Sequence, residues 1–254
     1  MSNLINPMQL NGKKILVVGA LSGVGKETVQ VLDSLGAKVI LVDESNELLQ
    51  TFVSTLNSTE HAFYSFDPYN TLEIEPRIKK IIAENGPINS FAFCAGIGGV
   101  KPLLYTTTPF FHNMMNANLY SFVEFVRCVT RKGSFIQGGS IVVMSSVSSL
   151  KGLKSKTAYC ASKAALNAAV KCLAAELSGK KIRVNSIVKG GVETDMQKDF
   201  LKNIMTLDQH NDMEKQILGI TKPREIANMI AFLLSDATNT ITGTALVIDG
   251  GYTL

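Results

Sequence analysis

The sequence predicts an α/β fold in which a doubly wound parallel β-sheet carries helices on both faces, within a single domain that spans residues 1–254. Two observations lead to this prediction. Strand-like and helix-like segments alternate along the chain, which is typical of parallel sheets whose strands are joined by helices. The strand-like segments are also nearly continuous apolar runs, as in strands that are buried on both faces of a sheet.

The bounds of the predicted elements follow from apolar runs, glycines and prolines. We expect strands at residues 14–18, 38–42, 62–66, 88–94, 141–145, 182–188 and 245–248. We expect helices at residues 24–35, 45–56, 72–83, 109–132 and 156–177, and a further helix that begins at Pro223. Gly36 ends the first helix, and Pro109 suits the first position of the long one.

The segment between residues 190 and 220 is long and mixed in character. Apolar residues recur there among polar ones at roughly helical spacing. A loop of this length in a compact domain is usually a lid or a binding loop, so the segment is a candidate substrate loop. A pair of ordinary surface helices accounts for the spacing equally well.

The composition narrows the class of protein. Hydrophobic residues make up 46% of the chain and charged residues 18%, as in ordinary globular enzymes. No apolar run approaches the roughly 18 residues of a membrane span, and the N-terminus lacks a basic segment followed by an apolar one. The four cysteines and three histidines show no metal-binding spacing. We therefore expect a cytoplasmic protein with reduced thiols, no membrane segment and no metal.

Tyr159 and Lys163 lie four residues apart in a run of good helix formers. On a helix this spacing places a phenol and an ammonium group on the same face, one turn apart. A nearby positive charge favours the phenolate and lowers the pKa of the tyrosine, which makes it a usable general acid or base. The alternative is a helix with two unrelated surface residues, because a Tyr-x-x-x-Lys match is common by chance.

Ser146 lies thirteen residues before Tyr159 and ends the apolar run that is predicted to be a buried strand. Ligands of open α/β sheets bind at the carboxyl ends of the strands. A hydroxyl at that position can hold a substrate carbonyl oxygen while Tyr159 delivers the proton. A serine that merely begins a turn is the alternative, but the neighbouring Tyr159 and Lys163 favour the catalytic interpretation.

A glycine-rich turn follows the first predicted strand and leads into a helix. Gly19, Gly23 and Gly25 let the backbone turn tightly and approach a pyrophosphate at the helix N-terminus. The second strand ends at Asp43, where a carboxylate accepts hydrogen bonds from the adenosine ribose of NAD and repels the 2′-phosphate of NADP. The pattern predicts a Rossmann-like site that prefers NAD over NADP. A helix-capping role for Asp43 is the alternative.

Together these residues resemble the short-chain dehydrogenase/reductase family over nearly the whole chain. The family's glycine turn matches residues 19–25, its late motif resembles residues 185–196, and its closing signature resembles Thr242-Gly and Asp249-Gly-Gly. The motifs occur in the family's order, which is far more specific than any one of them. The resemblance implies an NAD(P)-dependent oxidoreductase with a Rossmann fold that acts on CH–OH donors or the corresponding carbonyl compounds.

The resemblance also implies a set of site residues. The family's catalytic tetrad matches Asn118, Ser146, Tyr159 and Lys163. Its coenzyme contacts match Gly19, Leu21, Ser22, Gly23, Val24, Gly25, Asp43, Asp67, Pro68, Cys94, Ala95, Gly96, Tyr159, Lys163, Val192 and Thr194. In the family's scheme Tyr159 is the general acid/base, Lys163 lowers its pKa and holds the nicotinamide ribose, and Ser146 orients the substrate oxygen. Asn118 keeps a bend in its helix and holds a water that links Lys163 to solvent.

Three places depart from the family pattern. Val18 stands where threonine is usual, Phe93-Cys94 where two asparagines are usual, and Lys189 where proline is usual before Gly190. We expect these changes to affect coenzyme affinity and loop shape, and to leave the tetrad intact. Lys189 is in addition a candidate for contact with an anionic substrate or with the coenzyme pyrophosphate.

The substrate is not defined by these residues. Within the family the sequence most resembles 3-oxoacyl-acyl-carrier-protein reductases. The basic residues that are candidates for meeting an acidic carrier are Arg127, Arg131, Lys132, Lys180 and Lys181. Those reductases mostly use NADPH, whereas Asp43 indicates NADH, so sugars, polyols and steroids stay open as substrates. The net charge of +4 argues against nucleic acid and suits an anionic partner, although a slight surplus of surface lysine explains it equally well.

Two other classes of protein are alternatives to an enzyme. A nicotinamide-sensing binding protein uses the fold without turnover, as some members of the family do, and a structural partner subunit binds no coenzyme. The complete tetrad argues against both. The family commonly forms dimers and tetramers through two long helices, so we expect a homodimer or homotetramer that uses residues 109–132 and 156–177.

Overall fold

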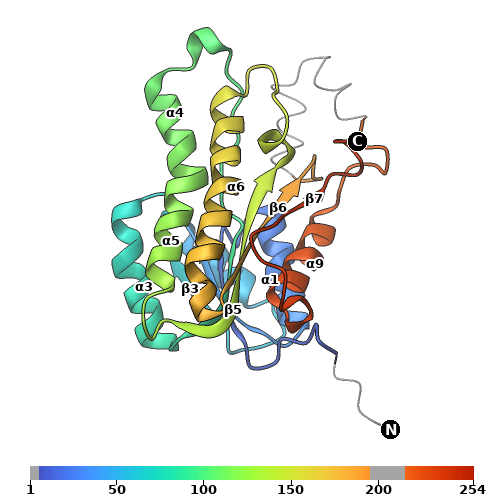
Figure 1. Cartoon of the computed structure of the whole chain (residues 1–254). Helices are drawn as coiled ribbons and strands as arrows, with labels where there is room; N and C mark the ends of the chain where they lie inside the picture. The colour runs from blue at the N-terminus through green and yellow to red at the C-terminus, as the bar shows by residue number, and fades with distance from the viewer. Residues whose placement is uncertain (1–5, 195–214) are drawn as a thin grey trace.

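Figure 1 shows the computed structural model, which describes residues 6–194 and 215–254. Its centre is a seven-stranded sheet in the order β3-β2-β1-β4-β5-β6-β7, and every neighbouring pair of strands is parallel. The strands are β1 (Lys14–Val18), β2 (Lys38–Asp43), β3 (Ala62–Ser65), β4 (Ile88–Phe93), β5 (Phe135–Ser146), β6 (Arg183–Lys189) and β7 (Ala245–Ile248). The predicted parallel sheet is confirmed.

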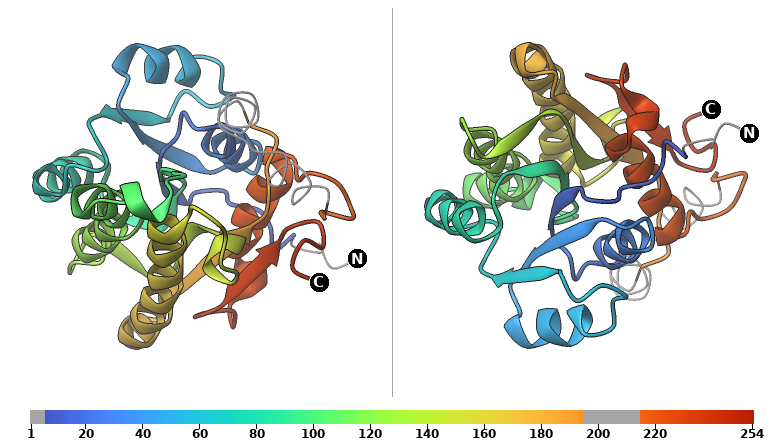
Figure 2. Two further views of the ribbon diagram at one scale, coloured as in Figure 1. Left: turned by 90° about the horizontal axis from the view of Figure 1, so that it is seen from above. Right: turned by 90° about the horizontal axis from the view of Figure 1, so that it is seen from below.

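Helices cover both faces of the sheet, as the two views of Figure 2 show. They are α1 (Gly23–Ser34), α2 (Asn46–Val53), α3 (Thr71–Asn85), α4 (Thr108–Met115), α5 (Ser121–Val129), α6 (Thr157–Leu177) and α9 (Pro223–Leu234). One hydrophobic core joins the sheet to α1, α2 and α9, and a second joins it to α3, α5 and α6. Burial on both faces explains why the strands are continuous apolar runs. None of the helices in the described ranges is long and apolar enough to cross a membrane.

The parallel strands all end at the same edge of the sheet, which we call the carboxyl edge and which is uppermost in Figure 1. The opposite edge, where the strands begin, is the amino edge. β1 lies between β2 and β4, so the connections after β1 and β4 diverge at this point of the carboxyl edge. Such a switch point is where open α/β sheets bind ligands. The ends of β1, β2, β4, β5 and β6 all carry predicted site residues.

The long helix expected at residues 109–132 is present over residues 108–129, but it is not a regular α-helix throughout. A π-helical turn, Asn116–Tyr120, separates α4 from α5. Asn118 is fully buried within this turn, and its side chain is hydrogen-bonded to the backbone of Ile97, far away in the sequence. A π turn holds one more residue per turn than an α-helix and occurs frequently at functional sites. Its cause is a long-range contact, which the helical periodicity of the sequence does not reveal.

Two other differences concern segment lengths. β5 begins at Phe135 rather than at residue 141, and its early part pairs with β4 through a register shift between Ile88 and Ser90. Gly138 and Gly139 weaken the local strand signal there, and pairing with β4 overrides it. The candidate substrate loop at residues 190–220 falls mostly outside the described residues.

Candidate active site

The glycine turn after β1 is packed backbone against backbone. Gly19 has φ of 79°, and a Cβ added there would lie 2.5 Å from the backbone nitrogen of Ala95, at the end of β4. A Cβ on Gly25 would collide with the carbonyl oxygen of Gly19. Ser22 caps α1, because its hydroxyl accepts a hydrogen bond from the Gly25 amide at 3.0 Å. The turn thus brings exposed backbone to the N-terminus of α1, as a pyrophosphate site requires.

Asp43 ends β2 and faces this turn. One carboxylate oxygen accepts a hydrogen bond from the Leu21 amide at 2.8 Å, and the other accepts one from the Glu44 amide at 2.9 Å. The carboxylate is therefore fixed beside the glycine turn. A carboxylate in that place can still accept hydrogen bonds from two adjacent ribose hydroxyls, because each oxygen has a second lone pair.

The segment after β6 closes over the same turn. Thr194 lies so close to Gly23 that a Cβ on Gly23 would be 2.8 Å from the threonine methyl group. Val192 is buried and forms a bridge with Thr221. The two predicted coenzyme-binding segments, one near the start of the chain and one near its end, are thus adjacent, and the residues present fit a dinucleotide along this edge.

Tyr69 and Gln216 are structural members of this edge that the sequence interpretation missed. The Tyr69 hydroxyl accepts a hydrogen bond from the Gly96 amide at 2.9 Å, and its carbonyl oxygen accepts one from the Asn116 side chain at 2.8 Å. Asp67 in turn accepts a hydrogen bond from the Tyr69 amide at 2.7 Å. The side-chain oxygen of Gln216 accepts a hydrogen bond from the Gly191 amide at 2.6 Å. Neither residue stands in a motif that could have identified it.

Both the oxygen and the nitrogen of the Asn118 side-chain amide make hydrogen bonds. The side-chain oxygen accepts a hydrogen bond from the Ile97 amide at 3.1 Å, and the nitrogen donates to the Ile97 carbonyl at 3.0 Å and to the Ser162 hydroxyl at 3.1 Å. These contacts tie the loop after β4 to the π turn and to α6. Gly96, next to Ile97, is so close that a Cβ there would lie 2.9 Å from the Asn118 oxygen and 3.4 Å from the Lys163 ammonium.

Ser146, Tyr159 and Lys163 converge at the end of β5. Ser146 is its last residue and is 5% exposed, and its hydroxyl makes a hydrogen bond with the Tyr159 side chain that lowers the pKa of the phenol. The Lys163 ammonium donates to the Met144 carbonyl at 2.9 Å and lies 6.0 Å from the centre of the Tyr159 ring. The structure therefore brings these three predicted residues together on one side of the carboxyl edge, with Asn118 behind them.

The pKa of Tyr159 runs opposite to the expected direction. Burial raises the pKa of this phenol, and the hydrogen bond with Ser146 offsets only part of the rise. The expectation that Lys163 lowers it is not met in the protein alone, because burial lowers the pKa of Lys163 to about 7, with Lys189 adding to the effect. An ammonium that loses its proton before the phenol does cannot stabilise the phenolate.

Lys189, the residue that departs from the family's proline, ends β6 directly opposite Ser146 in the strand register. Burial and, to a lesser extent, the charge of Lys156 lower the pKa of its ammonium to about 8. The effect of Lys189 on Lys163 places the two ammonium groups within electrostatic range of each other. A lysine pair of this kind is absent from the family pattern and marks this site as unusual.

The other departures lie in packed surroundings. Phe93 is 1% exposed, and its ring lies 5.6 Å from that of Phe122 and 5.7 Å from that of Phe125. Aromatic packing thus takes the place of the polar bracing that an asparagine would supply. Burial raises the pKa of the neighbouring Cys94 thiol to about 12, so this thiol is not a nucleophile at neutral pH. Val18 is fully buried in the core.

The basic residues considered for an acidic carrier lie away from the site. Arg127 lies in the last turn of α5, and the others follow α5 or α6 before β5 or β6 begins, which places all five near the amino edge. Arg127 and Arg131 both make ion pairs with Glu75 at 2.7 Å, and Lys180 donates to the Thr130 carbonyl at 2.7 Å. Within the described residues, these three side chains are engaged by their own protein. The suggested carrier surface is therefore poorly placed to deliver a substrate to Tyr159.

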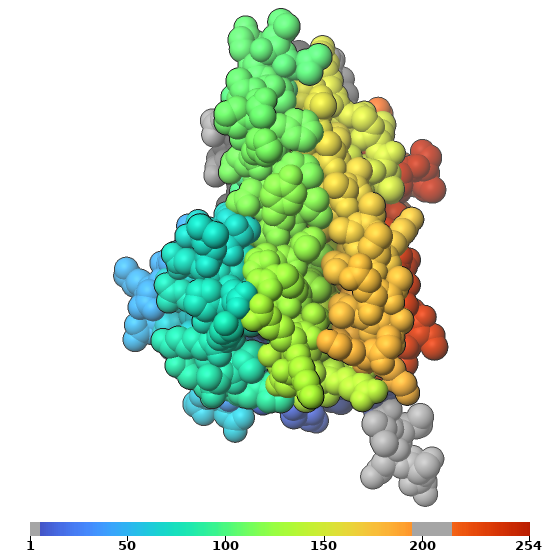
Figure 3. Space-filling view, turned by 60° about the vertical axis from the view of Figure 1, so that its left-hand side comes forward, coloured from blue at the N-terminus to red at the C-terminus, as the bar shows by residue number. Residues whose placement is uncertain are grey.

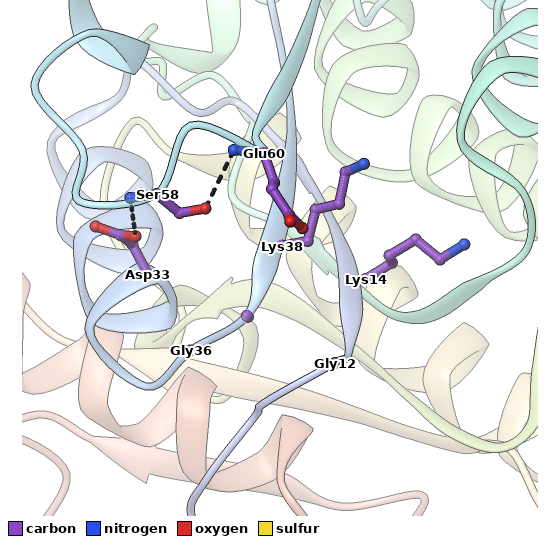
Figure 4. Close-up of a pocket in the computed structure, with 8 residues that line it drawn as sticks. Gly12, Lys14, Asp33, Gly36, Lys38, Ser58 and Glu60 are labelled. Carbon is purple, nitrogen blue, oxygen red and sulfur yellow. Dashed lines mark hydrogen bonds between the residues drawn. The ribbon is translucent and has the colours of Figure 1, made fainter.

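The amino edge also holds a cavity of about 400 Å³, shown in Figure 4. It is lined by Gly12, Lys14, Asp33, Gly36, Ala37, Lys38, Ser58 and Glu60. Asp33 belongs to a closed hydrogen-bond network and accepts from the Ser58 amide at 3.3 Å. The cavity lies where the strands begin, at the far end of the sheet from Tyr159, and has no part in the candidate active site.

Comparison with known proteins gives matches over almost the whole chain. Residues 19–253 match the family model described as Enoyl-(Acyl carrier protein) reductase. The 3-oxoacyl-[acyl-carrier-protein] reductase FabG of Thermotoga maritima is 32% identical over 250 residues, which cover 96% of this chain and 99% of that protein. The L-xylulose reductase of Caenorhabditis elegans is 33% identical over 247 residues, which cover 94% of this chain and 95% of that protein.

Solved structures agree with these matches. A short-chain dehydrogenase/reductase from Brucella melitensis, titled a glucose/ribitol dehydrogenase, superposes with a TM-score of 0.88 at 27% identity, covering 97% of this chain and 98% of that one. Fold and edge geometry define an α/β oxidoreductase built on a nucleotide-binding sheet. More particularly, the chain belongs to the short-chain dehydrogenase/reductase family, whose members use NAD(P) and act on alcohols or carbonyl compounds.

Proposed function

We propose that the protein transfers a hydride between NAD(H) and a carbonyl or secondary alcohol substrate, with Tyr159 as the general acid/base. The observation that carries this proposal is the convergence of Ser146, Tyr159 and Lys163 on the same carboxyl edge as the glycine turn. A bound nicotinamide coenzyme supplies the hydride. The residues of the chain position the substrate oxygen, exclude water and move the proton.

Ser146 and Tyr159 share one substrate oxygen in this mechanism. Their side chains are already hydrogen-bonded to each other, so both hydroxyls lie within reach of a single oxygen placed between them. The raised pKa keeps the phenol protonated at neutral pH, which is the state needed to donate a proton to a carbonyl that is being reduced. Lys163 is held by the Met144 carbonyl at 2.9 Å, and it supports the phenolate that remains only while it keeps its own proton. Asn118 fixes the loop that borders this group.

A preference for NAD(H) is part of the proposal. Asp43 sits beside the glycine turn with its carboxylate held by the Leu21 and Glu44 amides. A 2′-phosphate at this position would meet that negative charge and the charge of Glu44. We expect NADH to bind at least about tenfold more tightly than NADPH, and Asp43→Ser to narrow the difference, as measured by fluorescence titration of the two coenzymes.

The proposed function is tested by coenzyme consumption with purified protein. NADH and NADPH are each offered with ketones, oxo-thioesters and keto sugars, and Tyr159→Phe serves as the blank. Turnover with NADH that is lost in Tyr159→Phe is the expected result. Tight NADH binding without turnover over a broad panel would instead favour a nicotinamide-sensing protein, and turnover with NADPH alone would contradict the role given to Asp43.

A 3-oxoacyl thioester is a second candidate substrate, favoured by the 32% identity to the FabG protein. The engaged basic residues of the amino edge do not support a carrier-docking surface there. Acetoacetyl-coenzyme A and an acetoacetyl carrier protein separate the two possibilities. Equal kcat/KM for both would show that the enzyme recognises the thioester without the carrier. A much higher kcat/KM for the carrier protein would require a docking surface elsewhere on the molecule.

We also propose a homodimer or homotetramer in the cytoplasm. Figure 3 shows α4 and α5 in green beside α6 in yellow and orange, forming a broad helical face between them. The four cysteines are free thiols, which suits a reducing compartment. Light scattering that gives a monomer would contradict the assembly, and recovery of the protein in a membrane or secreted fraction would contradict the location.

A further inference from the structure

Lys189 is directed to the same side of the sheet as Ser146. Side chains alternate along β6, and Ser186 and Val188 face α6 and the Tyr252 side: the Ser186 hydroxyl donates to Asn167 of α6 at 3.0 Å, and Val188 packs with Val147 and Tyr252. Lys189 therefore points to the opposite face. Its register partner on β5 is Ser146, the last residue of that strand, so the lysine and the serine leave the carboxyl edge side by side.

Two other cations lie within electrostatic range of this lysine. Lys156, Tyr159 and Lys163 recur at the spacing of one face of α6 and its N-cap. The charge of Lys156 helps to lower the pKa of Lys189, and the charge of Lys189 helps to lower the pKa of Lys163. The Tyr159 phenol thus lies on a helix face that also carries lysines, and its hydrogen bond with Ser146 brings it to the strand ends where Lys189 lies.

Within residues 6–194 and 215–254, no carboxylate neutralises Lys189, and its ammonium makes no hydrogen bond or ion pair. Asp249 follows Ile248, the partner of Lys189 on β7, but its oxygens accept from the Gly251 amide at 2.9 Å and from the Thr253 amide and hydroxyl at 2.9 and 2.7 Å. Asp249 therefore holds the C-terminal turn. A half-buried cation beside two others raises the free energy of the folded protein unless an anion accompanies it.

We propose that Lys189 binds an anionic group, a carboxylate or a phosphate, that the substrate carries close to its reacting carbonyl or alcohol carbon. The inference rests on the proposed function, because it places that carbon between the hydroxyls of Ser146 and Tyr159. The substrate class is then that of short oxo acids and hydroxy acids or their phosphorylated counterparts, rather than neutral ketones or sugars. Lys189 is the specificity-determining residue of the site.

The surroundings of the site mouth agree with an anionic substrate. The loop between β5 and α6 carries Lys151 and Lys154, both exposed, and the Lys101 amide donates to the Ser155 carbonyl of that loop at 2.7 Å. Lysines thus add positive charge to two of the loops at the carboxyl edge. A positive potential of this kind attracts anions and raises their rate of association.

The coenzyme pyrophosphate is the other anion that Lys189 could meet, and the geometry disfavours it. The pyrophosphate position defined by the glycine turn is at the end of β1 and the start of α1. In the sheet order, β4 and β5 both lie between β1 and β6. Lys189 is placed with the reacting groups and not with the phosphate turn.

The test compares each acid with its neutral ester. 2-Oxobutanoate and 3-oxobutanoate are assayed with NADH against their ethyl esters, in wild type, Lys189→Met and Lys189→Arg, with Lys132→Met as the matched control at the amino edge. We expect Lys189→Met to lower kcat/KM for an acid that is turned over about 100-fold and for its ester less than about threefold, with Lys189→Arg retaining most activity. Equal losses for acid and ester, or no loss for either, would overturn the proposal.

Binding gives a readout that does not depend on turnover. Calorimetry of the NAD-saturated protein with 2-oxobutanoate and with inorganic phosphate separates the carboxylate from the phosphate as the preferred anion. We expect one of them to bind wild type and Lys132→Met alike, and to lose at least about tenfold in affinity in Lys189→Met. Anion binding that survives in Lys189→Met, or no anion binding to wild type, would overturn the proposal.

The two proposals fail in different ways. Lys189-dependent anion binding without turnover of any compound would retain the anion site and reject the catalytic function. Turnover of neutral ketones that is indifferent to Lys189 would retain the catalytic function and reject the anion site. Titration of NADH fluorescence completes the test, because a Lys189→Met protein that has lost NADH affinity would assign the lysine to the coenzyme and overturn its role in substrate binding.

Discussion

At the amino edge of the sheet, the Asp33 carboxylate and the His61 ring are only 3% and 0% exposed, and the atoms of the pair have partners. His61 Nδ1 accepts a hydrogen bond from the Val39 amide at 3.0 Å, so its Nε2 carries the proton and donates to Asp33 at 3.0 Å. Asn57 donates to Asp33 from both its backbone and its side chain. At the carboxyl edge, by contrast, Lys163 and Lys189 are cations that repel each other.

The two edges show two different roles of buried polar groups: those at the amino edge stabilise the fold, and those at the carboxyl edge are available to a ligand. Burial raises the pKa of Asp33, but the hydrogen bonds from Asn57, His61 and Ser58 outweigh it and leave the pKa lowered. This network joins α1, β2 and the segment before β3. A satisfied network strengthens the fold, whereas like charges held together weaken it and are retained where a ligand uses them.

The largest expected effect is a loss of activity that occurs when the carboxyl edge is changed and not when a tyrosine away from it is changed. Tyr159→Phe removes the proton donor, and we expect kcat to fall about 1000-fold in the proposed reaction, within the range for general acid/base groups. The matched control is Tyr64→Phe, which removes a hydroxyl that donates to Glu84 at 2.6 Å, away from the site. The control is expected to keep kcat within about twofold. Equal losses in steady-state assays of the two variants would contradict the assignment of the site.

The next effect concerns stability at the amino edge. Asp33→Ala leaves the buried His61 ring and the Asn57 amide without their acceptor, so we expect the free energy of unfolding to fall by about 3 kcal/mol. Urea denaturation followed by circular dichroism measures the loss. NADH affinity of the folded fraction should stay within about twofold of wild type. A loss below about 1 kcal/mol would show that the network is not structural.

Removing a charge at the carboxyl edge should have the opposite sign. Lys189→Met relieves repulsion with Lys163, so we expect the free energy of unfolding at pH 7 to rise by about 1 kcal/mol. The pKa values of Lys163 and Lys189 are lowered to about 7 and 8 from 10.5, so the unfolded chain binds more protons than the folded chain above these values. Stability of wild type from these groups therefore rises between pH 7 and 9 and falls as pH is lowered.

The same denaturation series in Lys189→Met measures that dependence. We expect a shallower rise between pH 7 and 9 than in wild type, because one of the two titrating groups is gone and Lys163 has lost a repelling neighbour. Lys132→Met is the control and should follow wild type. An unchanged slope in Lys189→Met would show that Lys189 ionises as an ordinary exposed lysine.

The smallest expected effect tests whether an exposed ion pair stabilises the amino edge as much as the buried Asp33 network does. Lys13 and Asp236 form an ion pair of 2.6 Å at that edge, with side-chain exposures of 21% and 63%. Because the pair is exposed on the Asp236 side, Asp236→Asn should change the free energy of unfolding by less than about 0.5 kcal/mol. A loss comparable with that of Asp33→Ala would mean that charge pairing alone, and not its burial, stabilises this edge.

Sequence patterns were sufficient where the structural cause is local. The apolar run of β1 and the glycines of the turn from Gly19 to Gly25 identified the sheet and the phosphate turn, because backbone geometry there admits only glycine at key positions. The spacing of Tyr159 and Lys163 likewise predicted that both residues lie on one face of a helix.

The features that could not be predicted from the sequence depend on tertiary contacts. The direction of the Tyr159 pKa depends on burial by the surrounding fold, which helical spacing does not encode. The same is true of Tyr69, whose role depends on its contact with Gly96 across the edge. The bend at Asn118 was implied by the family resemblance and not by helical periodicity. The fold was therefore more predictable than the electrostatics of the site.

The π turn at Asn116–Tyr120 has a consequence for how this part of the chain can change during evolution. One additional residue in a helix turns everything beyond it by about 100° around the axis. The turn thus differs from an uninterrupted α-helix by one residue, and this residue sets the direction of Asn118 while α4 and α5 keep their helical form. We expect the deletion of one codon in this turn to restore a regular helix and to rotate Asn118 away from Ile97, which would disconnect the loop after β4 from α6.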